Sequence, residues 1–240
     1  MTSLLDLAPA SPDGALLRGW VDLTCGQAAL ASKAIRFFEA VLERSPNHLE
    51  ANLGKARFLV DQSGDLEGAI TVLNRVIVAH EEFAPARVEK AKALMGQGQW
   101  EAAVEVAEHV LDANTADIDA ILIVILHALV VSGNYMQISG RIAKLVQALE
   151  KREPKNAGLF YEVARPLARL AGRRDFVLKH TVAMLEKAVV LDGRNSAVLT
   201  ELGYQRMLVG DIEGAKQAYR EAMAVDESNI AALNGIRWVG

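Results

Sequence analysis

An internal repeat with a period of about 34 residues is the feature that most constrains how this chain can fold. Each copy contains three residues spaced i, i+4 and i+7, so the three lie on one face of a helix. The first residues of the successive triplets are Ala34, Ala69, Ala103, Ile138, Thr181 and Ala215. The steps between them are 35, 34, 35, 43 and 34 residues. Because a single such repeat cannot bury its apolar face, the sequence predicts helical repeats that stack on one another.

The first residue of the triplet is small in most copies, and the residue four positions later is often larger. Ala34 is followed by Phe38, and Ala215 is followed by Tyr219. A small residue lets two helices approach closely, and the larger side chain then enters the gap between the paired helices. We therefore predict that the triplets mark the packing seams between neighbouring helices.

Glycines and capping residues predict where the two helices of each repeat meet. Glycine tolerates the left-handed backbone that ends a helix. We expect such helix ends at Gly64, Gly98, Gly133, Gly172 and Gly210. The side-chain oxygens expected to cap the second helices belong to Asp65, Asn134 and Asp211.

The 43-residue step marks an irregular repeat. The helix before Pro154 is predicted to run about one turn further than its counterparts, and residues 170–180 are predicted to form a longer turn. Pro166 falls inside a first helix, where it removes a backbone hydrogen bond and clashes with the preceding turn. We therefore expect a kink or a late helix start at Pro166.

The period and the paired helices predict an all-α, right-handed α-solenoid of tetratricopeptide helix-turn-helix repeats. The predicted repeats are about 15–47, 48–82, 83–117, 118–156, 157–195 and 196–229. Residues 1–14, with Pro9, Pro12 and Gly14, are interpreted as the remnant of a preceding repeat or turn, and residues 230–240 as the first helix of a truncated seventh repeat.

The two ends of the chain favour a fragment of a longer solenoid. A solenoid normally closes with a polar capping helix. Here the last predicted helix carries Ile236 and Trp238, whose expected partners are missing. The alternative is a complete chain whose ends pair by self-association.

Composition excludes several classes of protein. The formal net charge of −4 argues against a nucleic-acid-binding protein, which would carry a basic surface. Cys25 is the single cysteine, so neither an internal disulfide nor a four-cysteine zinc site is possible. The longest apolar run, residues 120–131, is too short to span a bilayer, and the N-terminus lacks the features of a signal peptide. We expect no membrane insertion.

The sequence shows no pattern typical of catalysis. There is no glycine-rich phosphate loop, and the histidines lack metal-binding spacing. The histidines are scattered at His48, His80, His109, His127 and His180. We predict no enzymatic activity, no cofactor and no small-molecule substrate.

The concave face of a solenoid of this kind, lined by its first helices, is the expected binding surface. Chaperone-binding tetratricopeptide proteins grip a terminal carboxylate with Lys/Asn pairs on successive first helices. The corresponding pairs here are Gly54/Phe58, Val88/Lys92, Ile123/His127 and Thr200/Tyr204. Only Lys92 matches in type, so this clamp is not expected. The predicted partner-binding residues are Val88, Lys92, Ile123, His127, Thr200 and Tyr204.

This predicted groove is mixed and rather apolar, which suits a helix or an extended segment of a partner. The alternative is that these residues contact solvent or another part of the same long solenoid. A second candidate surface is a basic ridge formed by Arg165, Arg169, Arg173, Arg174 and Lys179. In an acidic chain such a ridge could dock an acidic partner, or it could simply be a solvated face.

Four stretches resemble, in order, the tetratricopeptide repeat protein 21 family. They are "ALLRGWVDLTCG", "GQWEAAVEVAEHVL", "PKNAGLFYEVA" and "TELGYQRMLVGDIEGAKQAYREAMAVDESNIAALNGI". The resemblance covers roughly residues 15–240. That family is the large repeat subunit of intraflagellar transport complex A.

The resemblance implies a non-catalytic scaffold in cilia and flagella that acts in retrograde transport and in ciliary entry of membrane cargo. Its implied partners are the other subunits of complex A, and its implied location is the cilium or flagellum and the basal body, on the cytoplasmic side. The alternative function is a stand-alone peptide-binding adaptor or co-chaperone module.

Overall fold

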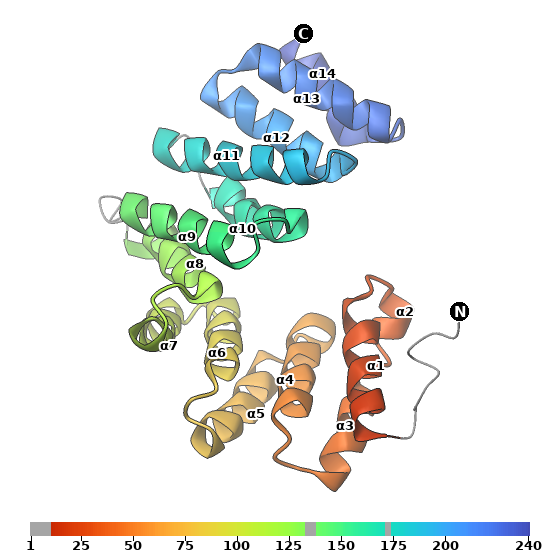
Figure 1. Cartoon of the computed structure of the whole chain (residues 1–240), viewed down its shortest axis with the longest axis vertical. Coiled ribbons are helices and arrows are strands. Elements are labelled where there is room, and N and C mark those ends of the chain that lie inside the picture. The colour runs from red at the N-terminus through yellow and green to blue at the C-terminus, as the bar shows by residue number, and fades with distance from the viewer. Residues whose placement is uncertain (1–10, 133–137, 171–173) are drawn as a thin grey trace. The chain divides into compact units, whose positions relative to one another are not determined.

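The computed structural model of the chain describes residues 11–132, 138–170 and 174–240. Every regular element in these ranges is helical, and they contain no strand (Figure 1). The chain divides into two compact units, Met1–Thr115 and Ala116–Gly240. The all-α class and the helix-turn-helix repeats predicted from the sequence are confirmed.

The helices of the first unit pack mainly on their neighbours in sequence. They are α1 (Pro12–Thr24), α2 (Ala28–Ala31), α3 (Ile35–Arg44), α4 (Leu49–Phe58), α5 (Leu66–Ala79), α6 (Ala84–Gly96) and α7 (Trp100–Ala113). A π-helical turn, η2 (Leu59–Ser63), continues α4. The short helix α2 and this π-helical turn were not predicted.

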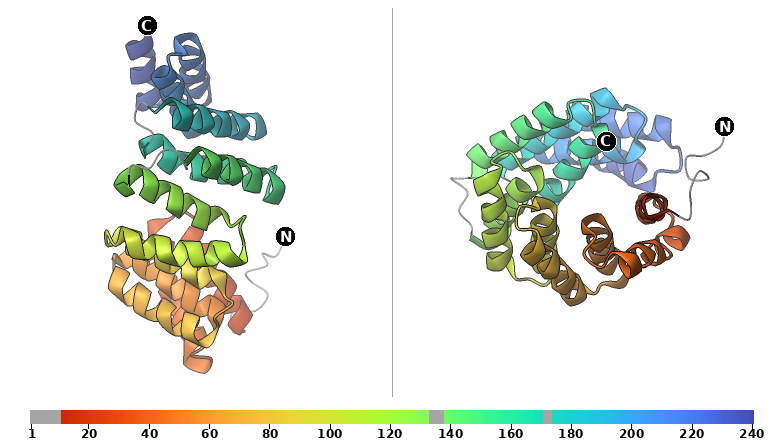
Figure 2. Two further views of the ribbon diagram at one scale, coloured as in Figure 1. Left: turned by 90° about the vertical axis from the view of Figure 1, so that its left-hand side faces the viewer. Right: turned by 60° about the horizontal axis from the view of Figure 1, so that its bottom comes forward.

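The second unit follows the same plan, and Figure 2 shows its helices, coloured green to blue, in successive layers. They are α8 (Ile118–His127), α9 (Ile138–Arg152), α10 (Ala157–Leu170), α11 (Asp175–Leu191), α12 (Ser196–Val209), α13 (Ile212–Val225) and α14 (Ile230–Val239). A π-helical turn, η3 (Ala128–Ser132), continues α8.

The predicted packing seams lie in the core. The six residues that begin the triplets are all 0% exposed: Ala34, Ala69, Ala103, Ile138, Thr181 and Ala215. Burial of a small side chain at this place brings two helix backbones close together, and a larger side chain from the same face then fills the remaining gap.

Aromatic side chains fill two of these gaps. Phe38 of α3 is fully buried and lies against Gly19 of α1 and Gly54 of α4. Tyr219 of α13 is 2% exposed and lies in the same way against a glycine of α12 and a glycine of α14. In both places an aromatic ring from a second helix occupies the space left by glycines on two first helices.

The helix ends match the predicted caps where the structure describes them. Gly64, Gly98 and Gly210 have left-handed φ values of 66°, 77° and 87°. The carboxylates of Asp65 and Asp211 accept hydrogen bonds from backbone N–H groups three residues later, at 2.9 and 3.0 Å. Gly133, Asn134 and Gly172, also predicted at helix ends, lie outside the described residues.

The irregular repeat differs partly from its prediction. α9 ends at Arg152, about one turn further beyond its triplet than α13 does, as expected. α11 already begins at Asp175, so most of the segment predicted as a longer turn is helical instead. α10 runs without interruption from Ala157 through Pro166, so the predicted late helix start is wrong.

The N-terminal turn is also different from its prediction. α1 begins at Pro12, and the hydroxyl of Ser11 accepts a hydrogen bond from the backbone N–H of Gly14 at 3.0 Å. Proline is favoured in the first turn of a helix because its missing N–H has no helical acceptor there. Pro12 and Gly14 therefore lie in a helix, and Pro9 lies outside the described residues.

Within the part of the chain that the structure describes, no helix combines the length and the apolar character needed to cross a bilayer.

Candidate partner-binding surfaces

The residues predicted to line the binding face divide into buried and accessible ones. Val88 is 5% exposed and Ile123 is 3% exposed, so these two side chains belong to the core and do not form a surface. Lys92, His127, Thr200 and Tyr204 are at least partly exposed. Four of the six predicted residues are therefore accessible, and two are not.

The accessible residues differ in the interactions that their side chains already make within the chain. The ammonium of Lys92 pairs with Glu89 on the same helix at 3.1 Å. The hydroxyl of Thr200 donates to the carbonyl of Ser196 at 2.7 Å and also accepts a hydrogen bond from the side-chain amide of Asn229. Tyr204 is 41% exposed, which leaves much of its ring available to a partner.

One residue beside the predicted basic ridge, Tyr161, was not identified from the sequence. Tyr161 of α10 is half-buried, and burial raises the pKa of its hydroxyl, with Arg165 opposing this shift and Glu201 adding to it. Tyr161 therefore lies near a carboxylate of α12, on the face of α10 that carries Arg165 and Arg169. The i, i+4 spacing of Tyr161 and Arg165 in the sequence could have indicated that Tyr161 lies on the same helix face as Arg165.

The described residues of the predicted basic ridge come from α10 and from the N-terminal part of α11, with its N-cap. Arg165 and Arg169 are exposed on α10, where they line a hollow of about 400 Å³ together with Glu162 and Pro166. Arg174 is the N-cap residue of α11, and Lys179 lies within α11 and not in the predicted turn. Arg173 lies outside the described residues.

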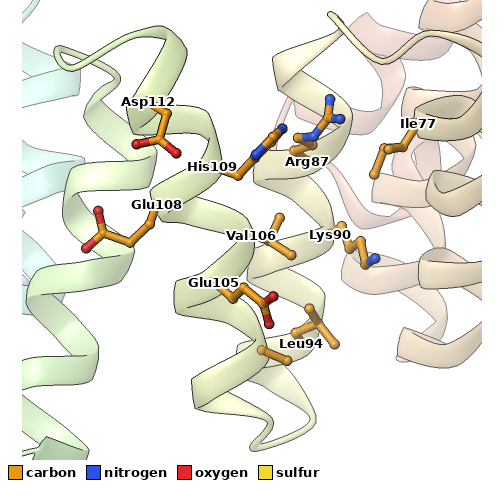
Figure 3. Close-up of a pocket in the computed structure, with 10 residues that line it drawn as sticks. Ile77, Arg87, Lys90, Leu94, Glu105, Val106, Glu108, His109 and Asp112 are labelled. Atoms are coloured by element: carbon orange, nitrogen blue, oxygen red, sulfur yellow. The ribbon is translucent and has the colours of Figure 1, made fainter.

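A groove that the sequence did not indicate lies in the first unit, between α5, α6 and α7 (Figure 3). It has a volume of about 620 Å³. The residues that line it are Ile77, Arg87, Lys90, Leu94, Ala102, Glu105, Val106, Glu108, His109 and Asp112. The sequence analysis did not predict this groove, because its lining comes from three helices of two successive repeats.

The walls of this groove carry charges of both signs. In Figure 3, Arg87 of α6 and His109 of α7 point toward one another, and Glu108 and Asp112 project from the other side of α7. The guanidinium of Arg87 donates to the backbone carbonyl of Glu81. The groove is wide and open with an apolar floor, which suits contact with a protein surface better than enclosure of a small molecule.

No group of three or more metal-ligating side chains occurs among the described residues. The surfaces of these residues offer ion pairs, hydrogen bonds and apolar contacts, which are the elements of protein recognition.

Residues 2–104 match the Tetratricopeptide repeat protein 21 N-terminal ARM repeat, and residues 140–239 match the Tetratricopeptide repeat protein 21 second ARM domain. These two segments make up most of the chain. The chain belongs to the tetratricopeptide repeat protein 21 family. The resemblance inferred from the four sequence stretches is thereby confirmed.

Individual family members match nearly the whole chain. Tetratricopeptide repeat protein 21B of Mus musculus is 34% identical over 226 residues, which cover 94% of this chain and 17% of that protein. The Homo sapiens 21B protein is 32% identical over 97% of this chain and 18% of its own length. Tetratricopeptide repeat protein 21A of Mus musculus is 32% identical over 98% of this chain and 18% of its own length. The chain thus spans 17–18% of the length of these relatives.

Solved structures with the same fold have much lower sequence identity to this family member. The crystal structure of the APC/C hetero-tetramer Cut9-Hcn1 has a TM-score of 0.71 at 16% identity, over 98% of this chain and 44% of that chain. The crystal structure of yeast Tom70 has a TM-score of 0.65 at 11% identity, over 95% of this chain and 46% of that chain. These likenesses show the helical-repeat fold, whose extended surfaces serve as scaffolds for protein interactions.

Proposed function

We propose that this chain is a non-catalytic interaction scaffold within a subunit of intraflagellar transport complex A, acting in retrograde ciliary transport. Its partners are then the other complex A subunits, and its place is the cilium or flagellum and the basal body. The observation that carries the proposal is the match of residues 2–104 and 140–239 to two segments of the tetratricopeptide repeat protein 21 family. The helical-repeat fold supports it, because such folds expose side chains from many successive helices to partners.

Contacts spread over several faces are the expected mode of binding. Among the residues predicted from the sequence, Lys92, His127, Thr200 and Tyr204 are accessible enough to touch a partner. Lys92 belongs to the first unit and the other three belong to the second. A scaffold that binds through several separate faces loses little when one contact is removed, because the other contacts still hold the partners.

The proposal is tested by affinity purification of the tagged chain from an extract of ciliated cells, followed by mass spectrometry. Recovery of the other complex A subunits supports the scaffold function. Recovery of heat-shock chaperones alone indicates the stand-alone adaptor instead. A folded chain that recovers neither refutes a docking role for this segment.

Variants separate the scaffold from a single peptide groove. Tyr204→Ala and Lys92→Glu each remove one accessible contact. A scaffold predicts small, separate losses in the recovery of complex A subunits, whereas a peptide groove predicts that one substitution abolishes binding. Circular dichroism of each variant establishes that the helices remain folded.

A further inference from the structure

Arg165 and Arg169 of α10 form a pair of positive charges in this acidic chain. They lie four residues apart and therefore on one helix face, and both are exposed. Other arginines of the described helices do find carboxylates: Arg18 pairs with Asp22 at 2.8 Å, and Arg206 pairs with Glu186 at 2.8 Å. Neither Arg165 nor Arg169 has a carboxylate within 4.0 Å among the described residues. Two like charges thus lie on one helix face, and no carboxylate of the described residues forms an ion pair with either of them.

Pro166 adds a backbone acceptor beside these two arginines. Proline has no N–H, so it cannot donate the helical hydrogen bond to the carbonyl four residues earlier, which is that of Glu162. Glu162, Arg165, Pro166 and Arg169 line one hollow of about 400 Å³. The residues that line this hollow therefore include two guanidinium donors and a residue whose carbonyl lacks its usual helical donor.

We propose that this hollow binds an extended segment of a partner protein with acidic side chains at alternate positions. The two carboxylates bind Arg165 and Arg169, and a backbone N–H of the segment donates to the carbonyl of Glu162. The proposal rests on the scaffold function above and names the chemistry of one partner for it.

The spacing of Arg165 and Arg169 along α10 matches that of alternate side chains in an extended segment. Residues four apart in a helix are separated by about 6 Å along its axis. Alternate side chains of an extended chain lie on the same side and are about 6.6 Å apart. Two carboxylates at alternate positions therefore reach both guanidiniums at once, and arginine binds carboxylates through strong, paired hydrogen bonds.

Neighbouring side chains limit what the hollow accepts. The carboxylate of Glu162 lines it, and Glu201 of α12 lies near Tyr161. These acids repel a long uninterrupted acidic run, so two acidic groups next to an apolar residue fit better. The half-buried ring of Tyr161, one turn before Arg165, offers the apolar contact.

The test measures fluorescence anisotropy of a labelled short peptide with aspartates at alternate positions and a leucine beside them. The control peptides replace the aspartates by asparagines, or place the same aspartates next to one another. We expect the alternating acidic peptide to bind the whole chain, with affinity that falls as salt is raised, and the asparagine peptide not to bind. Absence of measurable binding by the alternating peptide overturns the proposal.

Variants locate the binding. Arg165→Ala with Arg169→Ala should weaken binding by at least about tenfold, since two charge-assisted contacts are lost. The matched control, Arg194→Ala with Arg220→Ala, removes two exposed arginines outside α10 and should change the affinity by less than about twofold. Equal losses in the two double variants would show a mere effect of net charge and overturn the site.

Pro166→Ala tests the backbone acceptor separately. Alanine restores the N–H that can donate to the carbonyl of Glu162, so we expect weaker peptide binding together with a more stable helix. Unchanged or tighter binding of the peptide by Pro166→Ala would show that the carbonyl of Glu162 does not take part in the proposed site. A peptide phosphorylated on serine that binds while the aspartate peptide does not also overturns the proposal as stated.

The outcomes for the site and for the scaffold function are distinct. If the double arginine variant still recovers complex A subunits from a ciliated-cell extract but no longer binds the peptide, both the scaffold and the site stand. If the wild-type chain binds the peptide but recovers no complex A subunit, the site stands and the proposed function fails.

Discussion

Phe38 packs against the backbone of Gly54 so closely that a β-carbon on Gly54 would lie 2.3 Å from the ring. Phe38 comes from α3 and Gly54 from α4, and a β-carbon on Gly19 of α1 would lie 2.8 Å from the same ring. The ring is fully buried, so it has no space into which to move. The absence of a side chain at Gly54 therefore sets how closely the two helices approach.

Gly54→Ala should destabilise the chain despite the better helix propensity of alanine. The added methyl group overpacks the buried ring, and overpacking of this kind typically costs about 1–3 kcal/mol. The matched control is Gly140→Ala in α9, where an added β-carbon meets nothing within 4 Å. There we expect a gain of about 0.5–1 kcal/mol from helix propensity alone. Urea denaturation followed by circular dichroism measures both changes, and an equal gain in the two variants would contradict the close contact.

Asn229→Asp should destabilise the second unit because the amide of Asn229 donates to two hydroxyl oxygens. Its Nδ2 donates to Ser196 Oγ at 2.6 Å and to Thr200 Oγ1 at 2.8 Å. Both hydroxyls already donate their own protons to backbone carbonyls, at 2.9 and 2.7 Å. A carboxylate at this position would face oxygen lone pairs without a proton between them, and we expect a loss of about 1–3 kcal/mol.

The control for Asn229→Asp is Asn195→Asp. The oxygen of Asn195 accepts from the backbone N–H groups of Ala197 and Val198, so a carboxylate caps the helix equally well. We expect its effect on the free energy of unfolding to stay within about 0.5 kcal/mol. Thermal unfolding of both variants measures these changes in stability. Equal stability of Asn229→Asp and Asn195→Asp would contradict the donor role of Asn229.

Stability should fall at high pH because of Tyr219. Burial raises the pKa of Tyr219 to about 12, with Glu201 and Tyr204 adding to the shift. In the unfolded chain a tyrosine has a pKa near about 10. Between these two values the unfolded state loses the proton while the folded state keeps it, so the free energy of unfolding decreases as the pH rises through this window.

Tyr219→Phe should remove that part of the pH dependence. Urea denaturation at about pH 9 and about pH 11.5, on either side of the ordinary tyrosine pKa, compares the variant with the wild type. Tyr204→Phe is the control, because Tyr204 is 41% exposed. A Tyr219→Phe chain with the same pH dependence as the wild type would show that this hydroxyl is not the group responsible.

Gly210→Ala should cost stability through the backbone alone. Gly210 ends α12 with a φ of +87°, and an added β-carbon meets nothing within 4 Å. A left-handed conformation costs an alanine about 1–2 kcal/mol, whereas asparagine adopts it more readily. We therefore expect Gly210→Asn to lose less than Gly210→Ala in urea denaturation. A larger loss of stability in Gly210→Asn than in Gly210→Ala would mean that side-chain contacts, and not the backbone conformation, determine the effect of substitutions at this position.

Much of the fold could be predicted because it depends on local spacing. The triplets fall on one helix face whatever the tertiary structure is, so their burial followed from the period of the helix. The caps at Asp65 and Asp211 also depend on residues within one turn. Segments in which local signals conflict were predicted less well. α10 continues through Pro166, because its apolar residues recur at helical spacing on both sides of the proline. α11 begins at Asp175, within the segment expected to be a loop, and its own buried residues also recur at helical spacing.

The candidate surfaces were harder to predict than the core. Val88 and Ile123 occupy first-helix positions expected to face a partner, yet neighbouring helices cover them. The side of a helix that a residue occupies follows from the sequence, but whether a residue at the edge of that side is covered depends on the neighbours. The first-unit groove was missed for the same reason, since Ile77, Lys90 and Glu105 come from three helices.

The sequence by itself determined the repeated helices, their boundaries near capping residues and the family, because these depend on spacing along the chain and on ordered matches. Only the tertiary structure decided that Gly54 and Gly19 lie against the ring of Phe38, and that no carboxylate of the described residues lies within 4.0 Å of Arg165 or Arg169. Packing and ion pairing are properties of distances between helices, and a distance of a few ångströms across a helix interface is not encoded in the period of any single helix.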